Sequence, residues 1–193
     1  MVINRSKNRL DDMRSLDRAK TPFVAGDVRL LPSALAARMP ITTALWAKDM
    51  PETHGGCYCG NIRSQASFSR ELASYNPRAC DCDFCRKHAA AYVSDPKGSL
   101  RLQIGNELEV NRFRQGSNTA EMLLCRTCGV LVGALYRESN RLFGAPNAKA
   151  LDPRLSFGPE QGVSPKLLSP DQKVQRWRDI WFPDVILAIE RSS

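Results

Sequence analysis

Seven cysteines in three tight clusters restrict what this chain can fold into more than any other feature of its sequence. The clusters are Cys57-x-Cys59, Cys80-x-Cys82-x-x-Cys85 and Cys125-x-x-Cys128. An odd number of cysteines excludes a complete disulfide framework. The N-terminus lacks the apolar segment of a secretory signal, so we expect a cytoplasmic protein with reduced thiols. Reduced cysteines in such clusters typically bind metal, and these spacings favour zinc.

The first and last clusters predict a closed zinc site with four thiolate ligands. In an extended strand, residues two apart point to the same side, so Cys57 and Cys59 can reach one ion. The Cys125-x-x-Cys128 turn aims two sulfurs at one point, as in zinc ribbons. A glycine directly follows each pair and permits a tight turn of the backbone. We therefore expect these four cysteines to hold a structural zinc.

The remaining cysteines, Cys80, Cys82 and Cys85, predict a second zinc site with an open coordination position. Three protein ligands leave a fourth position for water or substrate, which is the arrangement of catalytic zinc. Three thiolates also make the ion a weak Lewis acid, better suited to binding a soft ligand such as a thiol than to generating hydroxide. We therefore expect two zinc ions per chain and treat these three cysteines as candidate catalytic residues.

Other interpretations of the cysteine-rich region stay open. The seven cysteines could divide differently between the sites, and an iron–sulfur cluster is the main rival metal centre. His88, three residues after Cys85, would make the second site structural if it completed the coordination. Arg86 and Lys87 either offset the negative charge of the site, hold a substrate carboxylate, or face solvent. We interpret His54 as an exposed polar residue.

Strands and turns are predicted from residue 57 onward. Gly105-Asn106, between two apolar runs, predicts one hairpin. The segment from Cys125 to Gly129 predicts the tip of a second hairpin, which carries two metal ligands. The expected strands are 57–68, 89–93, 100–104, 108–113, 120–125, 130–136 and 142–145.

One short helix is predicted near the C-terminus. Ser169 is a candidate N-cap, Pro170 suits the first helical position, and Gln172 completes a capping box. Trp177 and Trp181 then fall on one apolar stripe of the helix. We expect these tryptophans to anchor the core rather than to stack on a ligand.

Residues 1–49 differ in character from the rest of the chain. They are polar and charged at first, contain three prolines, and lack the periodicity of a packed core. Met50 begins a segment that resembles a natural protein start. We interpret residues 1–49 as a flexible N-terminal extension or an over-called gene start, and residues 50–193 as the zinc-binding domain.

The net charge of +8 does not by itself indicate a nucleic-acid-binding protein. Half of the excess lies in residues 1–49, and elsewhere the basic residues are interspersed with acidic ones. No apolar run approaches the length of a membrane-spanning helix. We therefore expect neither a nucleic acid nor a membrane as partner. The oligomeric state is not indicated.

The cysteine clusters and their neighbours resemble the glutathione-dependent formaldehyde-activating (GFA) enzyme family, which includes the centromere protein V relatives. The resemblance covers roughly residues 51–185. It rests on the segments Gly55-Gly56-Cys57-Tyr58-Cys59-Gly60-Asn61-Ile62-Arg63, Cys80-Asp81-Cys82-Asp83-Phe84-Cys85-Arg86-Lys87 and Leu124-Cys125-Arg126-Thr127-Cys128-Gly129. Asn147 also stands where the family often has an asparagine. Asp81 departs from the Cys-His-Cys that many members have, and an acid beside the metal would disfavour an anionic substrate.

The resemblance implies a fold, two metal sites and an activity. The fold is mainly β, with coiled antiparallel sheets around the structural zinc (an Mss-four-like fold). The first and last cysteine pairs would hold the structural zinc, and the central triplet the catalytic one. The activity would be that of a carbon–sulfur lyase acting on the adduct of a thiol, such as glutathione, and a small aldehyde, as in S-(hydroxymethyl)glutathione synthesis. The alternative is a non-catalytic zinc module that binds a protein or nucleic acid.

Overall fold

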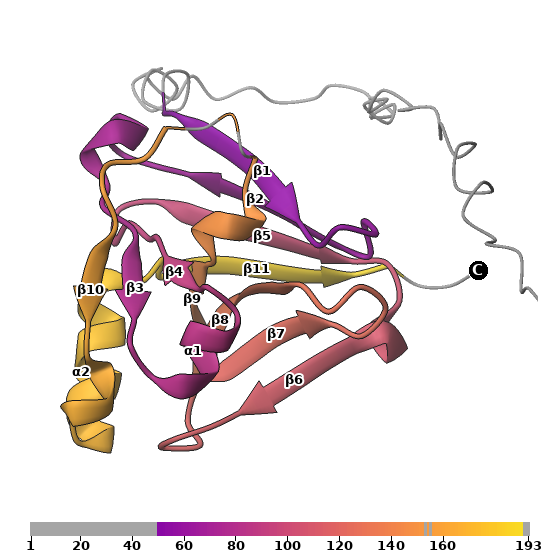
Figure 1. Cartoon of the computed structure of the whole chain (residues 1–193). Coiled ribbons are helices and arrows are strands. Elements are labelled where there is room, and N and C mark those ends of the chain that lie inside the picture. Colours follow the sequence, from indigo (N-terminus) through magenta and orange to yellow (C-terminus); the bar gives the residue numbers. More distant parts are fainter. Residues whose placement is uncertain (1–49, 153, 155, 191–193) are drawn as a thin grey trace, which may run out of the picture. The chain divides into compact units, whose positions relative to one another are not determined.

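The computed structural model describes residues 50–152, 154 and 156–190 (Figure 1). These residues form three β-sheets and two α-helices, together with short 3-10 turns. The mainly β class predicted from the sequence is thus confirmed, including the helix near the C-terminus. The prediction for residues 1–49 falls outside the described residues. No helix in the described ranges is both long and apolar enough to cross a membrane.

The first sheet has four strands in the order β1-β2-β5-β11. Their bounds are β1 Glu52–Gly56, β2 Ile62–Ser67, β5 Ser99–Ile104 and β11 Asp184–Ile189. The first three pair antiparallel, whereas β11 runs parallel to β5. Ile62 and Ala66 of β2, and Leu100, Leu102 and Ile104 of β5, are buried and alternate with more exposed residues. The sheet therefore presents one apolar face to the core.

A second four-stranded sheet is antiparallel throughout, in the order β6-β7-β8-β9. Its strands are β6 Val110–Arg114, β7 Glu121–Cys125, β8 Leu131–Glu138 and β9 Arg141–Pro146. The hairpin of β7 and β8 has its tip at residues 126–130, which confirms the hairpin predicted around Cys125 and Cys128. The predicted strand over 142–145 is confirmed as part of β9.

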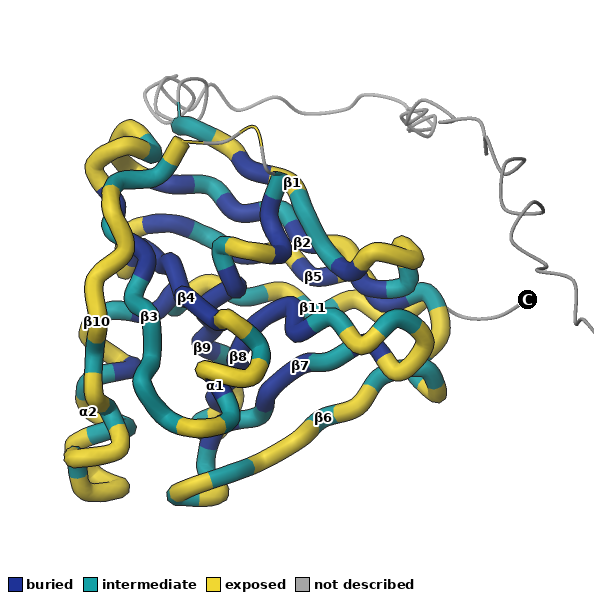
Figure 2. Tube along the Cα trace, viewed as in Figure 1, coloured by how far each residue is buried: buried dark blue, intermediate teal, exposed yellow. Residues whose placement is uncertain are grey.

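β8 is buried on both faces because it separates two apolar cores (Figure 2). Val132 and Leu135 belong to the core that includes the first sheet. Ala134 and Tyr136 belong to a second core, which also contains Cys85, Trp177 of the C-terminal helix and Trp181, the C-cap of that helix. The second sheet thus joins the main core on one side to the neighbourhood of the cysteine triplet on the other.

A small third sheet carries this triplet. Its order is β10-β3-β4, with β3 Arg78–Cys80, β4 Ala91–Tyr92 and β10 Gln161–Val163. β10 runs parallel to β3, and β4 antiparallel to it. The helix α1, Asp83–Lys87, lies between β3 and β4 in the chain. The sequence did not predict it, because five residues are too few for a periodic pattern.

The hairpin predicted around Gly105-Asn106 is wrong. β5 lies between β2 and β11 in the first sheet, whereas β6 pairs with β7 in the second. The two apolar runs are therefore neighbours in sequence only. The intervening residues form a 3-10 turn, Glu107–Glu109, and the side chain of Asn106 caps it by accepting a hydrogen bond from the Leu108 amide at 3.0 Å.

The predicted C-terminal helix is confirmed as α2, Pro170–Ile180. Ser169 and Gln172 form the expected capping box, in which each side chain bonds the backbone amide of the other residue. Trp177 and Trp181 are buried, and their rings stack with centroids 5.1 Å apart. In Figure 1, α2 lies beside β10, so it covers the region of the third sheet.

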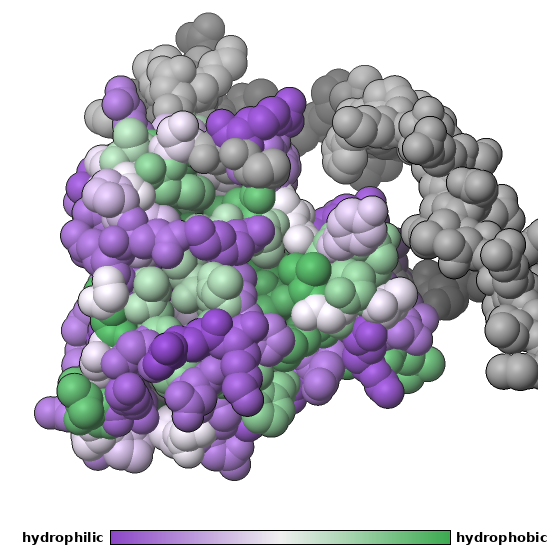
Figure 3. All heavy atoms as spheres, viewed as in Figure 1, coloured by the Kyte–Doolittle hydropathy of each residue, from purple (hydrophilic) through white to green (hydrophobic). Residues whose placement is uncertain are grey.

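Hydrophilic and hydrophobic residues are mixed on the face of the molecule shown in Figure 3. The large apolar side chains that are most exposed, Tyr58, Leu108 and Leu167, lie in separate segments of the chain. Isolated apolar residues of this kind are normal on globular domains. They do not by themselves indicate a binding surface.

Candidate metal centres

Four cysteine sulfurs from two distant parts of the chain meet at one point. The Sγ atoms of Cys57, Cys59, Cys125 and Cys128 all lie within 4.8 Å of one another. Cys59 Sγ is 3.6 Å from Cys57 Sγ and 3.4 Å from Cys125 Sγ. Four sulfurs arranged tetrahedrally around Zn²⁺ would be about 3.8 Å apart, given Zn–S bonds near 2.3 Å. The donor set and its spacing therefore fit a closed zinc site.

A tight turn, not a strand, aims the first cysteine pair. β1 ends at Gly56 and β2 begins at Ile62, so the strand predicted over 57–68 is correct only in its second half. Between the strands, the amide of Gly60 donates to the carbonyl of Cys57 at 3.1 Å, and the amide of Ile62 donates to Cys57 Sγ at 3.2 Å. The expectation that a strand would aim this pair is wrong, because residues two apart on a strand are separated by about 6.6 Å, whereas the two sulfurs lie 3.6 Å apart.

The second pair is held by the same kind of turn at the tip of the β7–β8 hairpin. The Gly129 amide donates to the Cys125 carbonyl at 2.9 Å, and the Cys125 amide donates to the Val130 carbonyl at 3.0 Å. Gly129 has φ +75° and Gly60 has φ +81°, a backbone conformation that glycine adopts without strain. The two glycines that follow the cysteine pairs therefore close the two turns.

The thiols of this cluster differ in acidity because their surroundings differ. Burial raises the pKa of Cys57 to about 12. Burial also acts to raise the pKa of Cys128, but hydrogen bonds from the backbone at Cys59 and Val130 outweigh it and lower the pKa to about 6. The site thus supplies one thiolate readily at neutral pH, and a bound cation would favour ionisation of the others.

Cys80, Cys82 and Cys85 form the second cluster, again with all sulfurs within 4.8 Å of one another. Cys80 ends β3, Cys82 is the N-cap of α1, and Cys85 lies inside that helix and is only 2% exposed. A hydrogen bond from Cys85 lowers the pKa of Cys80 to about 6, and the same interaction together with burial raises the pKa of Cys85. One thiolate is therefore present at neutral pH, and the three sulfurs fit a soft metal ion with a further position to fill.

A cavity of about 210 Å³ adjoins this cluster, and all three cysteines line it. Its apolar side includes Tyr92, Met122, Trp177 and Trp181. The loop between β6 and β7 contributes Gln115, Gly116 and Ser117. The tryptophans are buried as predicted, but they also line the cavity, so their surfaces are available to a ligand. A metal on the triplet would face this cavity.

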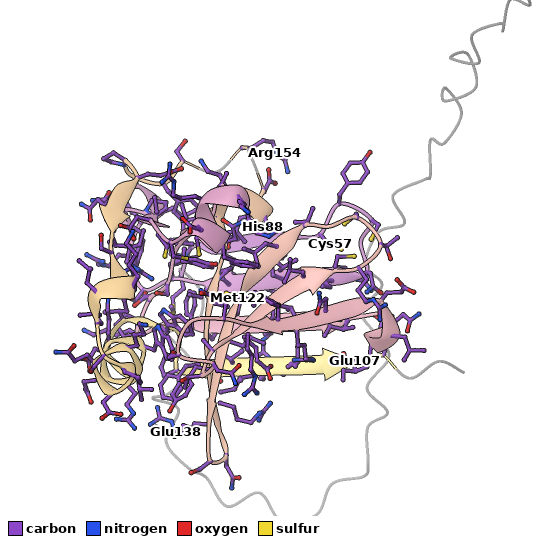
Figure 4. The ribbon with its side chains drawn as sticks, turned by 60° about the horizontal axis from the view of Figure 1, so that its bottom comes forward. Cys57, His88, Glu107, Met122, Glu138 and Arg154 are labelled. Atoms are coloured by element: carbon purple, nitrogen blue, oxygen red, sulfur yellow. The ribbon has the colours of Figure 1, made fainter. Side chains whose placement is uncertain are left out.

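Tyr92 lies at the buried end of the triplet. Its hydroxyl oxygen is 3.4 Å from Cys85 Sγ and 3.6 Å from Met122 Sδ. Burial raises the pKa of Tyr92, so the hydroxyl stays protonated and acts as a hydrogen-bond donor at neutral pH. In Figure 4, Cys57 lies apart from Met122 and His88, so the two cysteine clusters occupy different parts of the domain.

The basic residues predicted beside the triplet do not line the cavity. Arg86 and Lys87 are exposed on α1, so the alternative that they face solvent is the one observed. His88 is the C-cap of α1, and its ring packs against Phe84 with centroids 4.6 Å apart. In the described part of the chain His88 does not join the sulfurs of the triplet. His54 is exposed, as expected.

Asp81 does not line the cavity, although it lies between two of its cysteines in the sequence. Its Oδ2 accepts a hydrogen bond from Ser164 Oγ at 2.7 Å and pairs with Lys166 Nζ at 3.1 Å. These contacts lower the pKa of Asp81. Its negative charge is therefore paired with Lys166, a residue that lines the cavity, and this pairing offsets its repulsion of an anion inside.

Asn147 is buried and joins three segments of the fold. Its side-chain oxygen accepts hydrogen bonds from the amides of Ala91 and Lys149, both at 3.2 Å, and its side-chain nitrogen donates to the Leu131 carbonyl at 3.1 Å. It thus fixes β4 against β8 next to the triplet. The structure gives this asparagine a positioning role.

Sequence reasoning missed three basic residues that line the cavity: Arg78, Lys173 and Arg176. Arg78 lies two residues before Cys80 on β3, so both side chains leave the strand on the same side. That spacing was visible in the sequence. Lys173 and Arg176 come from α2, more than 80 residues away, and only the fold brings them to the cysteines.

Comparison with known proteins places the chain in a family. The family model described as "Glutathione-dependent formaldehyde-activating enzyme" (GFA) matches residues 52–161, which is more than half of the chain. The chain belongs to the GFA family. The match contains all seven cysteines, so both clusters lie within the GFA domain, whereas α2 and β11 lie beyond the matched range.

A crystal structure of a Rhodobacter sphaeroides protein is also similar to this chain. The two sequences are 27% identical over 52% of this chain and 92% of the other, with a TM-score of 0.40. The assignment to the GFA family rests on the family model.

Proposed function

We propose that this GFA protein is a zinc-dependent enzyme of the carbon–sulfur lyase type, acting in the cytoplasm on the adduct of a thiol and a small aldehyde. Cys57, Cys59, Cys125 and Cys128 would hold a structural zinc. Cys80, Cys82 and Cys85 would hold the catalytic one. Glutathione and formaldehyde, named in the description of the family, are the first substrates to test.

The observation that carries this proposal is that all three sulfurs of the triplet line a cavity. A structural zinc site has four protein ligands and needs no access. The triplet has three, and the space in front of it is lined by aromatic and aliphatic side chains with a few polar groups. Small-molecule sites are typically built in this way.

Zinc bound to the triplet would supply an open position at which a soft thiolate binds. The reaction is an addition with no redox change: the thiol sulfur forms a bond to the carbonyl carbon, and the carbonyl π bond breaks. The proton lost by the thiol ends on the former carbonyl oxygen, which gives an S-hydroxymethyl product when the aldehyde is formaldehyde. The reverse direction breaks the carbon–sulfur bond.

Residues of this chain would position the reactants. Trp177, Trp181 and Met122 line the cavity and limit the water beside the triplet. Tyr92 holds Cys85 through its hydroxyl, which stays protonated. Gln115, on the loop between β6 and β7, donates from Nε2 to Cys82 Sγ at 3.8 Å and so fixes that loop against the site.

The substitution Cys82→Ser tests the function. Cys82 is the N-cap of α1 and makes no side-chain capping bond, and serine is a favoured N-cap, so the helix should form in the variant. We expect zinc content to fall from two ions per chain to one. The enzyme-catalysed exchange of glutathione with S-(hydroxymethyl)glutathione, followed by exchange NMR, should fall to the uncatalysed rate.

The neighbouring substitution Asp83→Asn is a matched control, because it changes an exposed residue of the same helix and keeps all three sulfurs. It should retain both zinc ions and the exchange rate. Equal exchange by the parent and Cys82→Ser would exclude catalysis at the triplet. The non-catalytic zinc module, which binds a macromolecule, would then be the better interpretation.

A further inference from the structure

Three basic side chains line the cavity beside the cysteine triplet. These are Arg78, Lys173 and Arg176, here called the cationic wall. Arg78 is on β3, two residues before Cys80, so the two side chains lie on the same side of the strand. Lys173, Arg176 and Trp177 are three and four residues apart on α2, so they share one face of that helix. The cationic wall is therefore set by regular secondary structure.

The cationic wall has no carboxylate partner among the residues that the structure describes. No Asp or Glu in these ranges lines the cavity, and no ion pair involves any of the three residues. The fourth basic residue at the cavity, Lys166, is paired with Asp81. Arg78 donates to the neutral hydroxyl of Ser94 at 2.5 Å.

Partial burial makes this arrangement costly for the free protein. Arg78, Lys173 and Arg176 are all half-buried, and all three line the same cavity. Charged groups withdrawn from water are normally paired, because their desolvation is otherwise uncompensated. Two guanidinium groups kept close together without a carboxylate are what a site for an anionic ligand requires.

The triplet itself offsets only part of this charge. Three thiolates around Zn²⁺ carry a formal charge of −1, whereas the cationic wall carries +3. A ligand that adds one thiolate and one carboxylate brings the total to zero. A neutral thiol that binds as a thiolate leaves an excess of +1. The charge of the cavity therefore favours a ligand with two acidic groups, one of them a thiol.

We propose that the cationic wall binds the carboxylate of a small mercaptocarboxylic acid whose thiol reaches the cysteine triplet. This rests on the proposed function and names its substrate class. The guanidinium groups of Arg78 and Arg176 offer the planar donor pairs that match a carboxylate, and Lys173 adds a third charge. Tyr92, Met122 and Trp177 line the same cavity, and their apolar surface suits a short apolar spacer.

The size of the cavity supports a short ligand. The cavity has a volume of about 210 Å³. This space is enough for a thiol and a carboxylate joined by two or three carbons. The carboxylate on the cationic wall would then set which thiols are accepted.

The probe is 3-mercaptopropionate, compared with its methyl ester, which keeps the thiol and removes the charge. Binding of each to the zinc-loaded full-length protein is measured by titration calorimetry. We expect the acid to bind on the order of tenfold more tightly than the ester, because charge-assisted hydrogen bonds are the strong ones. Equal affinities would overturn the proposal for the cationic wall and leave the thiol site intact.

The substitution Arg176→Gln tests whether the cationic wall causes the preference for the acid. It should abolish the preference for the acid while the ester binds as before. Arg178→Gln is the matched control: it removes the same charge from the same helix, but Arg178 is exposed and paired with Glu138 outside the cavity. The control should keep the preference. Retention of the preference in Arg176→Gln and Arg78→Gln alike would overturn the proposal.

Propionate separates this proposal from the proposed function. It carries the carboxylate without the thiol, and dependence of its binding on Arg176 distinguishes the cationic wall from carboxylate ligation of zinc. Arg176-dependent propionate binding, in a protein whose triplet neither binds thiols nor catalyses exchange, would support the cationic wall and refute the enzyme. Thiol exchange that proceeds equally well with the acid and the ester would support the enzyme and refute the cationic wall.

Discussion

The hydroxyl oxygen of Tyr92 lies 3.4 Å from Sγ of Cys85, at the buried end of the cysteine triplet. Cys85 is the most buried of the three sulfur residues. A hydrogen bond to a metal-ligating sulfur orients it and stabilises its thiolate form, and groups of this kind influence metal affinity. The same hydroxyl lies 3.6 Å from Met122 Sδ on β7, and a thiolate on Cys85 is the stronger of the two acceptors for its single hydrogen.

Removal of this hydroxyl should weaken metal binding at the triplet. We expect Tyr92→Phe to lower the zinc affinity of the triplet by about 10- to 100-fold, because Cys85 loses its donor. The affinity of the four-cysteine cluster should be unchanged. Competition with a chromophoric chelator measures both. Tyr136→Phe is the control, since this buried tyrosine of the same core donates to Glu138 at 3.1 Å, away from the sulfurs. Equal losses in both variants would contradict the role given to Tyr92.

The four-cysteine cluster joins two parts of the chain that strand pairing does not join directly. Cys57 and Cys59 follow β1, and Cys125 and Cys128 flank the tip of a hairpin in another sheet. Metal binding at such a site contributes to folding itself. We expect Cys128→Ser to lose one zinc ion and several kcal/mol of unfolding free energy, measured by urea denaturation.

Cys82→Ser is the comparison for this prediction, because it also removes one ligand. The triplet lies within a single short stretch of chain, so its loss should leave the main core and its stability largely unchanged. Equal urea midpoints for the two variants would mean that the clusters do not differ in structural importance.

Local signals in the sequence were sufficient for several elements. The β7–β8 hairpin follows from two apolar runs around a metal-binding turn, and α2 follows from its capping box. Both depend on residues close together in sequence. The cysteine clusters were also visible, because their spacing alone restricts how sulfurs can meet, and the structure brings together the sulfurs within each predicted group.

Elements that depend on distant partners could not be predicted in the same way. β5 and β6 are adjacent in the chain, yet each pairs with strands that its own sequence does not specify. β11 has an apolar pattern that was not assigned to a strand, and its parallel partner β5 is some 80 residues earlier. Arg176 reaches the triplet only because α2 packs beside the third sheet. Tertiary packing decided these features.

The conformations of three glycines predict a graded series of stability losses. Gly60 has φ +81° and open space around a Cβ atom, so Gly60→Ala should cost only the strain of that conformation, about 1–2 kcal/mol. Gly56→Ala should cost more, because Gly56 has φ +145° and a Cβ atom would lie 2.1 Å from the Ile62 carbonyl oxygen.

Gly162→Ala is the control of this series. It has neither a positive φ nor a neighbour within 4 Å of a Cβ atom, so it should be neutral or slightly stabilising. The unfolding free energies of the three zinc-loaded variants test the order. A loss for Gly162→Ala as large as that for Gly60→Ala would show that conformation is not the cause.

The buried carboxylate of Asp95 makes part of the unfolding free energy depend on pH. This carboxylate accepts hydrogen bonds from the Ser69 amide and hydroxyl and the Tyr75 hydroxyl, at 2.5–2.7 Å, and from the Lys97 amide at 2.9 Å. Burial alone would raise the pKa of Asp95, but these bonds outweigh it and hold the pKa below its ordinary value of 3.8. The folded protein therefore stabilises the ionised form of Asp95.

Because the folded pKa is depressed, this stabilisation is complete above pH 3.8 and is lost as the pH falls through the folded pKa. Asp95→Asn places an NH₂ group where an acceptor was, and it should cost about 1–3 kcal/mol at neutral pH. Urea denaturation from pH 7 to pH 3 should show the difference between parent and variant shrinking only at the acid end. The difference between parent and variant cancels the destabilisation that zinc loss causes in both proteins at acid pH. Exposed Asp83→Asn should show little difference at any pH, and a constant difference for Asp95→Asn would mean that its charge is not responsible.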